Sequence, residues 1–314
     1  FSVTIYGATG SVLSDIQQLC KVIRFLLALK DNRGFGRVQG TAFGHRVWFV
    51  WFSEVSNWID KRVIFSATAH LDGFQHSPDA KRLNAHEGSR VSYDNLKIRQ
   101  VPWANIPGSV QEILRDPDHV KTATSQIKHI ITEKASSKEV LVVMPKGLIK
   151  WFEKDMLPAI KDKQVHYTNY GRDIGSNEYR NCGSVILWSN FHKPKHVTFS
   201  EYLIYSEQEV DEDNLQHVDG GRMTGPVLNI QDSQLYAQIK QMGCRGNARN
   251  VDDHGVCGDM ELFICWDELD AGKLQAIYPN STFSMVTYMD PKFQGKTPKG
   301  VLPRTLNVLA RTQG

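Results

Sequence analysis

The chain has 314 residues, 41% of them hydrophobic and 23% charged, which is typical of one large or two medium globular domains. The formal net charge of +3 is too small to indicate nucleic-acid binding by itself. No apolar run reaches the ~18 residues of a membrane span and no secretion signal is visible. We therefore expect no membrane partner and a cytoplasmic, nucleoid or nuclear location. The five cysteines are scattered without a paired ligand motif, so the sequence predicts neither a disulfide framework nor a metal site.

The first 75 residues contain one helical pattern and two strand patterns. Apolar residues recur at helical spacing from 11 to 30, which predicts an amphipathic helix. The aromatic stretch from 45 to 52 predicts a strand. The short apolar run from 61 to 65 predicts a buried parallel strand, which ends in the tripeptide Ser66-Ala67-Thr68.

From residue 76 to 108 the pattern is polar with Gly and Pro, which predicts a linker between two domains. Strands and helices then alternate to residue 270. The predicted strands cover 139–144, 164–167, 184–188 and 261–266, and the predicted helices cover 120–133, 148–160 and 232–242. This alternation predicts an α/β fold with a mostly parallel sheet that carries helices on both faces. Residues 271 to 314 form a polar extension to which the sequence assigns no role.

Three segments combine residue types suited to phosphate chemistry. The first is Ser66-Ala67-Thr68, the second is the Gly-containing loop from 170 to 179 (YGRDIGSNEY), and the third is 241 to 249 (QMGCRGNAR). Small hydroxyls at the carboxyl edge of a parallel strand can hydrogen-bond to a ligand there. A Gly-rich loop lets backbone N–H groups approach phosphate. Two arginines can stabilise the charge of a transferring γ-phosphoryl group.

In this order, and with Pro145-Lys146 after an intervening strand, the segments resemble motifs III to VI of superfamily 2 helicases. The chain is most similar to the XPD/DinG-like branch, and the resemblance covers about residues 45 to 270. It implies two RecA-like domains. Residues 1–75 would hold the end of an inserted helical region and the last strands of the first domain. Residues 109–270 would form the second RecA-like domain.

The resemblance also implies catalytic and coupling roles. Ser66 and Thr68 would couple the state of ATP to the grip on nucleic acid. Arg245 and Arg249 would be candidates for the arginine that contacts the γ-phosphate. The family pattern is Gln-x-x-Gly-Arg-x-x-Arg, whereas here Cys244 replaces the Gly and the second Arg comes one residue late. The sequence therefore leaves open which arginine has this role.

The remaining implied contacts are to nucleotide and to nucleic acid. Gly175, Asn177 and Gln241 would contact nucleotide, and Lys146 and Lys193 would contact the nucleic-acid backbone. The partner would be single-stranded DNA or RNA. ATP and Mg²⁺ would be bound mainly by residues outside this chain, because no P-loop motif occurs in it. We expect the P-loop and the Asp-Glu pair for Mg²⁺ upstream.

The expected function is therefore the C-terminal portion of an ATP-dependent helicase or translocase. One alternative is a non-catalytic module that binds nucleic acid or protein through a helicase-like fold. A remote alternative is a Rossmann dinucleotide-binding protein, since residues 3 to 10 (VTIYGATG) resemble a strand that enters a Gly-x-x-Gly turn. Leu13 stands where that fingerprint has its third Gly.

Overall fold

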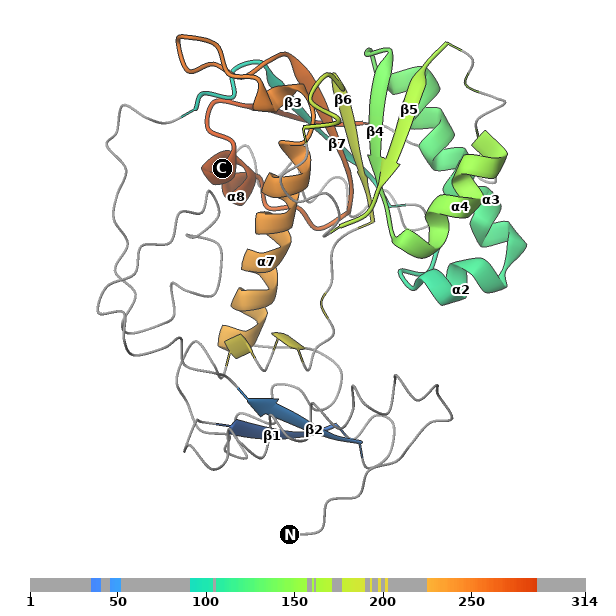
Figure 1. Ribbon diagram of the computed structural model, residues 1–314, viewed down its shortest axis with the longest axis vertical. Helices are drawn as coiled ribbons and strands as arrows, with labels where there is room; N and C mark the ends of the chain where they lie inside the picture. Colours follow the sequence, from blue (N-terminus) through green and yellow to red (C-terminus); the bar gives the residue numbers. More distant parts are fainter. Residues whose placement is uncertain are drawn as a thin grey trace, which may run out of the picture. The chain divides into compact units, whose positions relative to one another are not determined.

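The computed structural model describes residues 35–40, 46–51, 91–103, 106–156, 160, 162–170, 177–189, 193, 197–198, 201–202 and 225–286. The chain divides into two compact units (Figure 1). Unit 1 comprises residues 1–84 and 192–237, and unit 2 comprises residues 85–191 and 238–314. Within the described residues, no helix is long and apolar enough to cross a bilayer.

Unit 2 is built on a sheet of six strands that all run parallel, which confirms the predicted α/β, RecA-like parallel sheet. The strand order across the sheet is β5-β4-β6-β7-β3-β8. In chain order the strands are β3 (Leu96–Val101), β4 (Glu139–Val143), β5 (Gln164–Thr168), β6 (Ser184–Trp188), β7 (Met260–Cys265) and β8 (Thr282–Met285).

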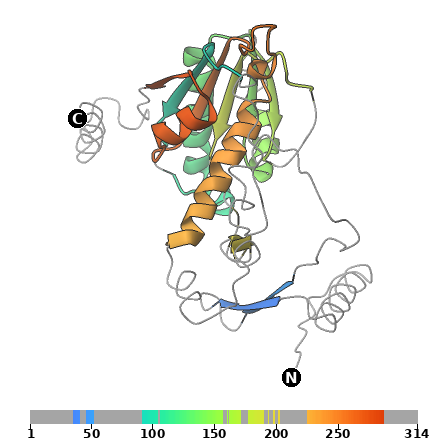
Figure 2. The same ribbon diagram turned by 90° about the vertical axis from the view of Figure 1, so that its left-hand side faces the viewer.

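Helices cover both faces of this sheet (Figures 1 and 2). One face carries α2 (Val110–Arg115), α3 (Pro117–His129) with a π-helical turn (Ile130–Lys134) after it, and α4 (Lys146–Met156). The other face carries the end of α7 (Gly225–Gly243) and α8 (Ala271–Ile277). The chain moves across the sheet in one direction from β3 to β5 and then reverses. Right-handed connections place the two sets of helices on opposite faces for that reason.

The core under α3 and α4 is made by alternate residues of the central strands. It includes Val142 of β4, Trp188 of β6 and Phe263 of β7, which are fully buried. Trp188 donates from Nε1 to Oε1 of Gln126 at 3.0 Å, and the Gln126 amide donates to the carbonyl oxygen of Pro102 at 2.7 Å. Both polar atoms of the buried amide are thereby satisfied, as burial requires.

Most elements predicted between residues 120 and 266 are confirmed within a few residues, but β3 was missed. It lies in the segment 76–108 that the sequence predicted as a linker, and in the structure it is hydrogen-bonded between β7 and β8. Its sequence LKIRQV mixes charged and apolar residues because only one face is fully buried. Similarly, α8 and β8 lie in the unassigned extension, and β8 pairs with β3.

The described strands of unit 1 form an antiparallel pair. In it β1 (Phe35–Gly40) pairs with β2 (Arg46–Trp51), with Phe35 opposite Trp51. The strand predicted at 45–52 is confirmed by β2. The helix predicted at 11–30, the strand predicted at 61–65 with Ser66 and Thr68, and the Gly-x-x-Gly turn lie outside the described residues.

Candidate functional site

Two of the three segments singled out by sequence meet at one end of the sheet in unit 2. The turn that ends the YGRDIGSNEY segment precedes β6, and the turn that ends the QMGCRGNAR segment precedes β7. The backbone N–H of Asn247 donates to the carbonyl oxygen of Cys182 at 2.9 Å. The side-chain amide of Asn250 donates to the carbonyl oxygen of Arg180 at 2.9 Å. We call this contact between residues 177–182 and 245–250 the motif junction.

The close approach of the two turns depends on Gly246. A Cβ atom at this residue would lie 2.6 Å from the carbonyl oxygen of Cys182, 2.6 Å from Cγ2 of Val185 and 2.7 Å from Sδ of Met260. Cβ atoms in folded proteins do not approach other heavy atoms so closely. Gly246 therefore lets the second turn pack directly onto the start of β6 and β7.

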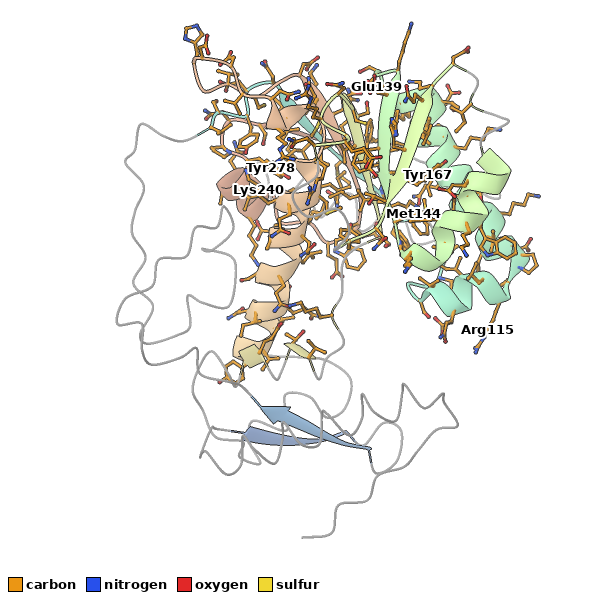
Figure 3. All side chains as sticks on the ribbon, viewed as in Figure 1. Arg115, Glu139, Met144, Tyr167, Lys240 and Tyr278 are labelled. Carbon is orange, nitrogen blue, oxygen red and sulfur yellow. The ribbon has the colours of Figure 1, made fainter. Side chains whose placement is uncertain are left out.

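A tyrosine, Tyr278, contacts the last turn of α7, just before the motif junction (Figure 3). The Tyr278 hydroxyl donates to the carbonyl oxygen of Ile239 at 2.8 Å, at the last turn of the helix. A Cβ atom at Gly243 would lie 2.2 Å from that hydroxyl oxygen, so only glycine fits there. The helix stops at Gly243, and Arg245 and Arg249 follow it instead of lying on it.

The two candidate arginines differ in accessibility. Arg245 is only 8% exposed, and its backbone N–H donates to the carbonyl oxygen of Met242 at 3.1 Å. Arg249 is exposed at the end of a short 3-10 helix (Asn247–Arg249), where its N–H donates to the carbonyl oxygen of Gly246 at 3.1 Å. The two residues therefore do not share one face of an α-helix, and of the pair Arg249 is the one that solvent reaches.

A third arginine belongs to the motif junction and was not predicted as a site residue. Arg180 is exposed and comes directly after Tyr179, the last residue of the YGRDIGSNEY segment. Its carbonyl oxygen accepts the hydrogen bond from Asn250, next to Arg249. The only sequence signal for Arg180 was its position directly after Tyr179. Asn177, predicted to contact nucleotide, is exposed at the start of the same turn, where its carbonyl oxygen accepts from the N–H of Arg180 at 3.3 Å.

The other predicted site residues are distributed more widely. Gln241 is half-buried on α7, one turn before Arg245. Gly175 lies outside the described residues. Lys193 belongs to unit 1, and its ammonium forms an ion pair of 2.6 Å with Glu201, which also accepts a hydrogen bond from Gln234. The Lys193 charge is therefore already matched by a carboxylate, which weakens the case for a phosphate contact.

The opposite, carboxyl end of the sheet has a second set of features. The order of the strands reverses between β4 and β6, which is where open α/β sheets bind ligands. Lys146 follows β4 there and is exposed. Ser189 follows β6 with a φ of 67°, in the left-handed region that non-glycine residues rarely adopt. Tyr170 donates to the carbonyl oxygen of Ser189 at 2.8 Å, and burial raises the pKa of Tyr170 well above its ordinary value.

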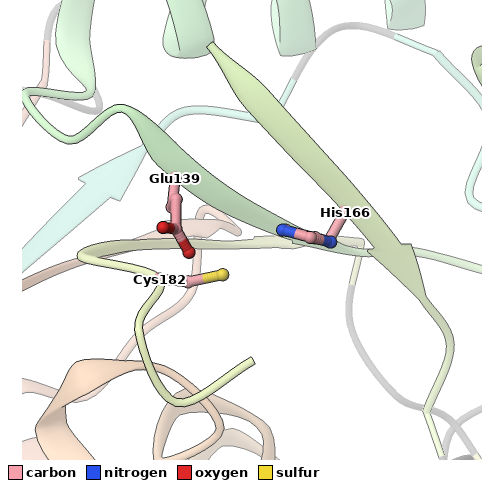
Figure 4. Close-up of side chains that lie close together, drawn as sticks. All are labelled: Glu139, His166 and Cys182. Carbon is pink, nitrogen blue, oxygen red and sulfur yellow. The ribbon is translucent and has the colours of Figure 1, made fainter. Parts of the chain in front are cut away.

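One cluster in unit 2 combines three kinds of metal ligand (Figure 4). Glu139 begins β4, His166 lies in the middle of β5, and Cys182 lies in the turn before β6 at the motif junction. Their ligand atoms all lie within 4.8 Å of one another. Burial, and then the Glu139 carboxylate, raise the pKa of the Cys182 thiol to about 12.

Comparison with protein-family models found no match, and no curated protein matches the chain.

Proposed function

We propose that unit 2 is a motor domain of a nucleic-acid-dependent ATPase, of the helicase or translocase kind, in which Arg249 contacts the γ-phosphate of ATP held by another domain. The observation that carries this proposal is the motif junction. There an exposed arginine is fixed on a short turn whose two ends are hydrogen-bonded to the turn of residues 177–182.

The location of the motif junction supports a role in which Arg249 acts on ATP held by another domain. It lies at the amino ends of β6 and β7, whereas nucleotides held by a parallel sheet lie at the carboxyl ends of its strands. An arginine that stabilises phosphoryl transfer does not require a phosphate cradle in its own domain. Such an arrangement agrees with the absence of a P-loop motif from the sequence. ATP and Mg²⁺ would then be held mainly by residues outside this chain.

We infer different roles for Arg245 and Arg249, because they differ in exposure to solvent. Arg249 is exposed, so it is the candidate catalytic residue. Arg245 is 8% exposed and would hold the turn in place. Lys146, exposed at the carboxyl end of β4, would contact the phosphate backbone of single-stranded DNA or RNA.

The test is ATP hydrolysis with and without single-stranded DNA or RNA, measured on this chain and on the full product of its gene. Arg249→Ala should lower kcat by about 10³-fold or more, with little change in the unfolding midpoint. Arg115→Ala, which removes an exposed arginine of α2, is the matched control and should leave kcat unchanged. Arg245→Ala should lower the unfolding midpoint instead.

Two outcomes would overturn parts of this proposal. If Arg249→Ala hydrolyses ATP like the wild type, Arg249 does not contact the transferring phosphate. If the full gene product hydrolyses no ATP with any single strand, yet the chain binds nucleic acid or protein, the domain is a binding module and has no catalytic role.

A further inference from the structure

We propose that Glu139, His166 and Cys182 form a Zn²⁺ site that fastens the turn before β6 to strands β4 and β5. The site concerns the folding of unit 2 and holds whether or not Arg249 acts on a nucleotide. No local sequence motif predicted this Zn²⁺ site. The scattered cysteines had indicated that the chain holds no metal site.

The register of the sheet brings two of the ligands together. In the parallel pair β4–β5, Leu141 lies opposite His166. Glu139 is two residues before Leu141, so its side chain lies on the same face of the sheet as the imidazole of His166. Figure 4 shows the carboxylate and the ring pointing toward one another.

The third ligand, Cys182, lies in a turn, and its backbone N–H and carbonyl oxygen are both hydrogen-bonded. The N–H of Cys182 donates to the carbonyl oxygen of Tyr179 at 2.9 Å, and its carbonyl oxygen accepts from Asn247 at 2.9 Å. The Tyr179 ring lies 5.7 Å from the His166 ring, centroid to centroid. The backbone hydrogen bonds therefore fix the turn that carries Cys182, and the Tyr179 ring packs against the ring of His166.

The geometry requires only a small adjustment to hold an ion. Zinc binds oxygen, nitrogen and sulfur at about 2.0–2.3 Å, so tetrahedral ligands lie about 3.5 Å from one another. The three ligand atoms are within 4.8 Å of one another, and Glu139 and His166 are only half-buried, so their side chains have room to move by about 1 Å.

The donor set selects the metal. A thiolate together with an imidazole suits zinc, whereas magnesium and calcium take oxygen ligands only. One thiolate and one carboxylate also balance the charge of Zn²⁺, which matters because Cys182 is 1% exposed. In the part of the chain that the structure describes, no hydrogen bond engages the Glu139 carboxylate, the His166 ring or the Cys182 thiol. Three protein ligands leave one position of the tetrahedron open.

The first experiment removes metal from the full chain with a chelator and then titrates it with Zn²⁺ or Co²⁺. We expect one equivalent of Zn²⁺ to bind and to raise the unfolding midpoint. We also expect Co²⁺ to give the near-ultraviolet charge-transfer absorption of a cobalt–thiolate bond. If the wild type binds neither ion, or binds Co²⁺ without that absorption, the site does not exist as proposed.

Variants separate this site from adventitious binding. Cys182→Ala should abolish the cobalt–thiolate absorption and weaken Zn²⁺ binding by more than about 100-fold, since loss of a ligand costs more than the ~10–100-fold loss caused by removing an outer partner. Cys265→Ala, at a buried cysteine of β7 in the same sheet, should retain both. If Cys182→Ala does not fold, Glu139→Gln keeps the side-chain volume and should weaken Zn²⁺ binding. Wild-type affinity in Cys182→Ala or in Glu139→Gln would overturn the assignment.

Discussion

The Lys240 ammonium donates a hydrogen bond of 2.6 Å to the phenol oxygen of Tyr93 and lies 3.8 Å from the centroid of that ring. The same ammonium lies 4.5 Å from the centroid of the Tyr278 ring and donates to the carbonyl oxygen of Ile277. One cation thereby ties the end of α7 to the residues before β3 and to the end of α8. Burial lowers the pKa of Lys240, because the aromatic surroundings replace water.

Replacing this cation tests how much the contact contributes. Lys240→Met leaves the Tyr93 hydroxyl and the Ile277 carbonyl without their donor, so we expect a loss of about 1–3 kcal/mol in the free energy of unfolding. Lys121→Met, at an exposed position of α3, should change stability by less than about 0.5 kcal/mol. Urea unfolding of both variants measures the difference. A Lys240→Met protein as stable as the wild type would mean that desolvation of the ammonium cancels its contacts.

Buried tyrosines predict that the protein loses stability in alkali. Burial raises the pKa of Tyr93, Tyr170 and Tyr278 well above the ordinary value of 10.0, and it raises the pKa of Tyr167 to about 12. Above about pH 10 the unfolded chain loses these protons while the folded chain keeps them. The folded state then binds more protons, so the stability present below about pH 10 falls as the pH rises.

Lys240 acts in the opposite direction, because its pKa is lowered on folding. The contribution of Lys240 to the free energy of unfolding rises with pH from its folded pKa up to the ordinary value of 10.5. Above pH 10.5 that contribution no longer changes. Above about pH 10.5 only groups whose pKa is raised on folding still change the stability, so we expect the urea midpoint to fall there, which unfolding curves at a series of pH values will show. Tyr167→Phe removes one contributing hydroxyl and should reduce the fall. A midpoint that stays flat in alkali would show that these phenols titrate normally in the folded state.

Glycine at position 246 should be irreplaceable at the motif junction. Gly246→Ala forces a Cβ atom against the backbone of Cys182 and the side chains of Val185 and Met260, so we expect a loss of about 1–3 kcal/mol. Gly108→Ala is the control, since a Cβ atom there meets nothing within 4 Å. Thermal unfolding of the two variants checks this. Equal midpoints would mean that the two turns separate at little cost, and that the motif junction does not fix Arg249.

Three of the strands that the sequence predicted, β4, β6 and β7, are buried on both faces. Apolar residues dominate β4, β6 and β7, with Leu262 to Cys265 uninterrupted in β7, because a central parallel strand is covered by helices on both sides. The sequence of β3 lacks this pattern, since Lys97 is exposed and Arg99 is half-buried. All four residues of β8 are exposed. In β3 the alternation of apolar and charged residues from Leu96 to Arg99 is a shorter and weaker signal than a continuous apolar run, and both strands pair with partners distant in sequence.

In the candidate site, too, the local sequence predicted some features, whereas others depend on residues that are far apart in the chain. Residue types and the family resemblance singled out the segments that form the motif junction, but they did not show that α7 ends before Arg245 and Arg249. At the end of α7 the close contact between Gly243 and Tyr278 involves a residue that is distant in sequence. The cluster of Glu139, His166 and Cys182 had no local signal, because the register of separate strands creates it.

A buried carboxylate at the start of β7 provides a test of ion pairing inside the sheet. Glu261 is 5% exposed and lies 2.7 Å from the guanidinium of Arg99 on the neighbouring strand β3. It also accepts hydrogen bonds from the N–H of Ser136 at 2.7 Å and from its hydroxyl at 2.9 Å. Removing one partner of such a pair leaves the other without a counter-charge, which costs more than removing both.

We therefore expect a double-mutant cycle of Arg99→Met and Glu261→Gln to give a coupling energy of at least about 1 kcal/mol. The matched control is the neighbouring pair Lys97–Asp259, whose charged atoms are 3.7 Å apart and whose side chains are 53% and 77% exposed. Solvent screens that pair, so its cycle of Lys97→Met and Asp259→Asn should give less than about 0.5 kcal/mol. Urea unfolding of the two sets of variants gives both energies. Equal coupling in the two cycles would mean that water reaches Glu261 in the folded protein, and that its hydrogen bonds to Ser136 open readily.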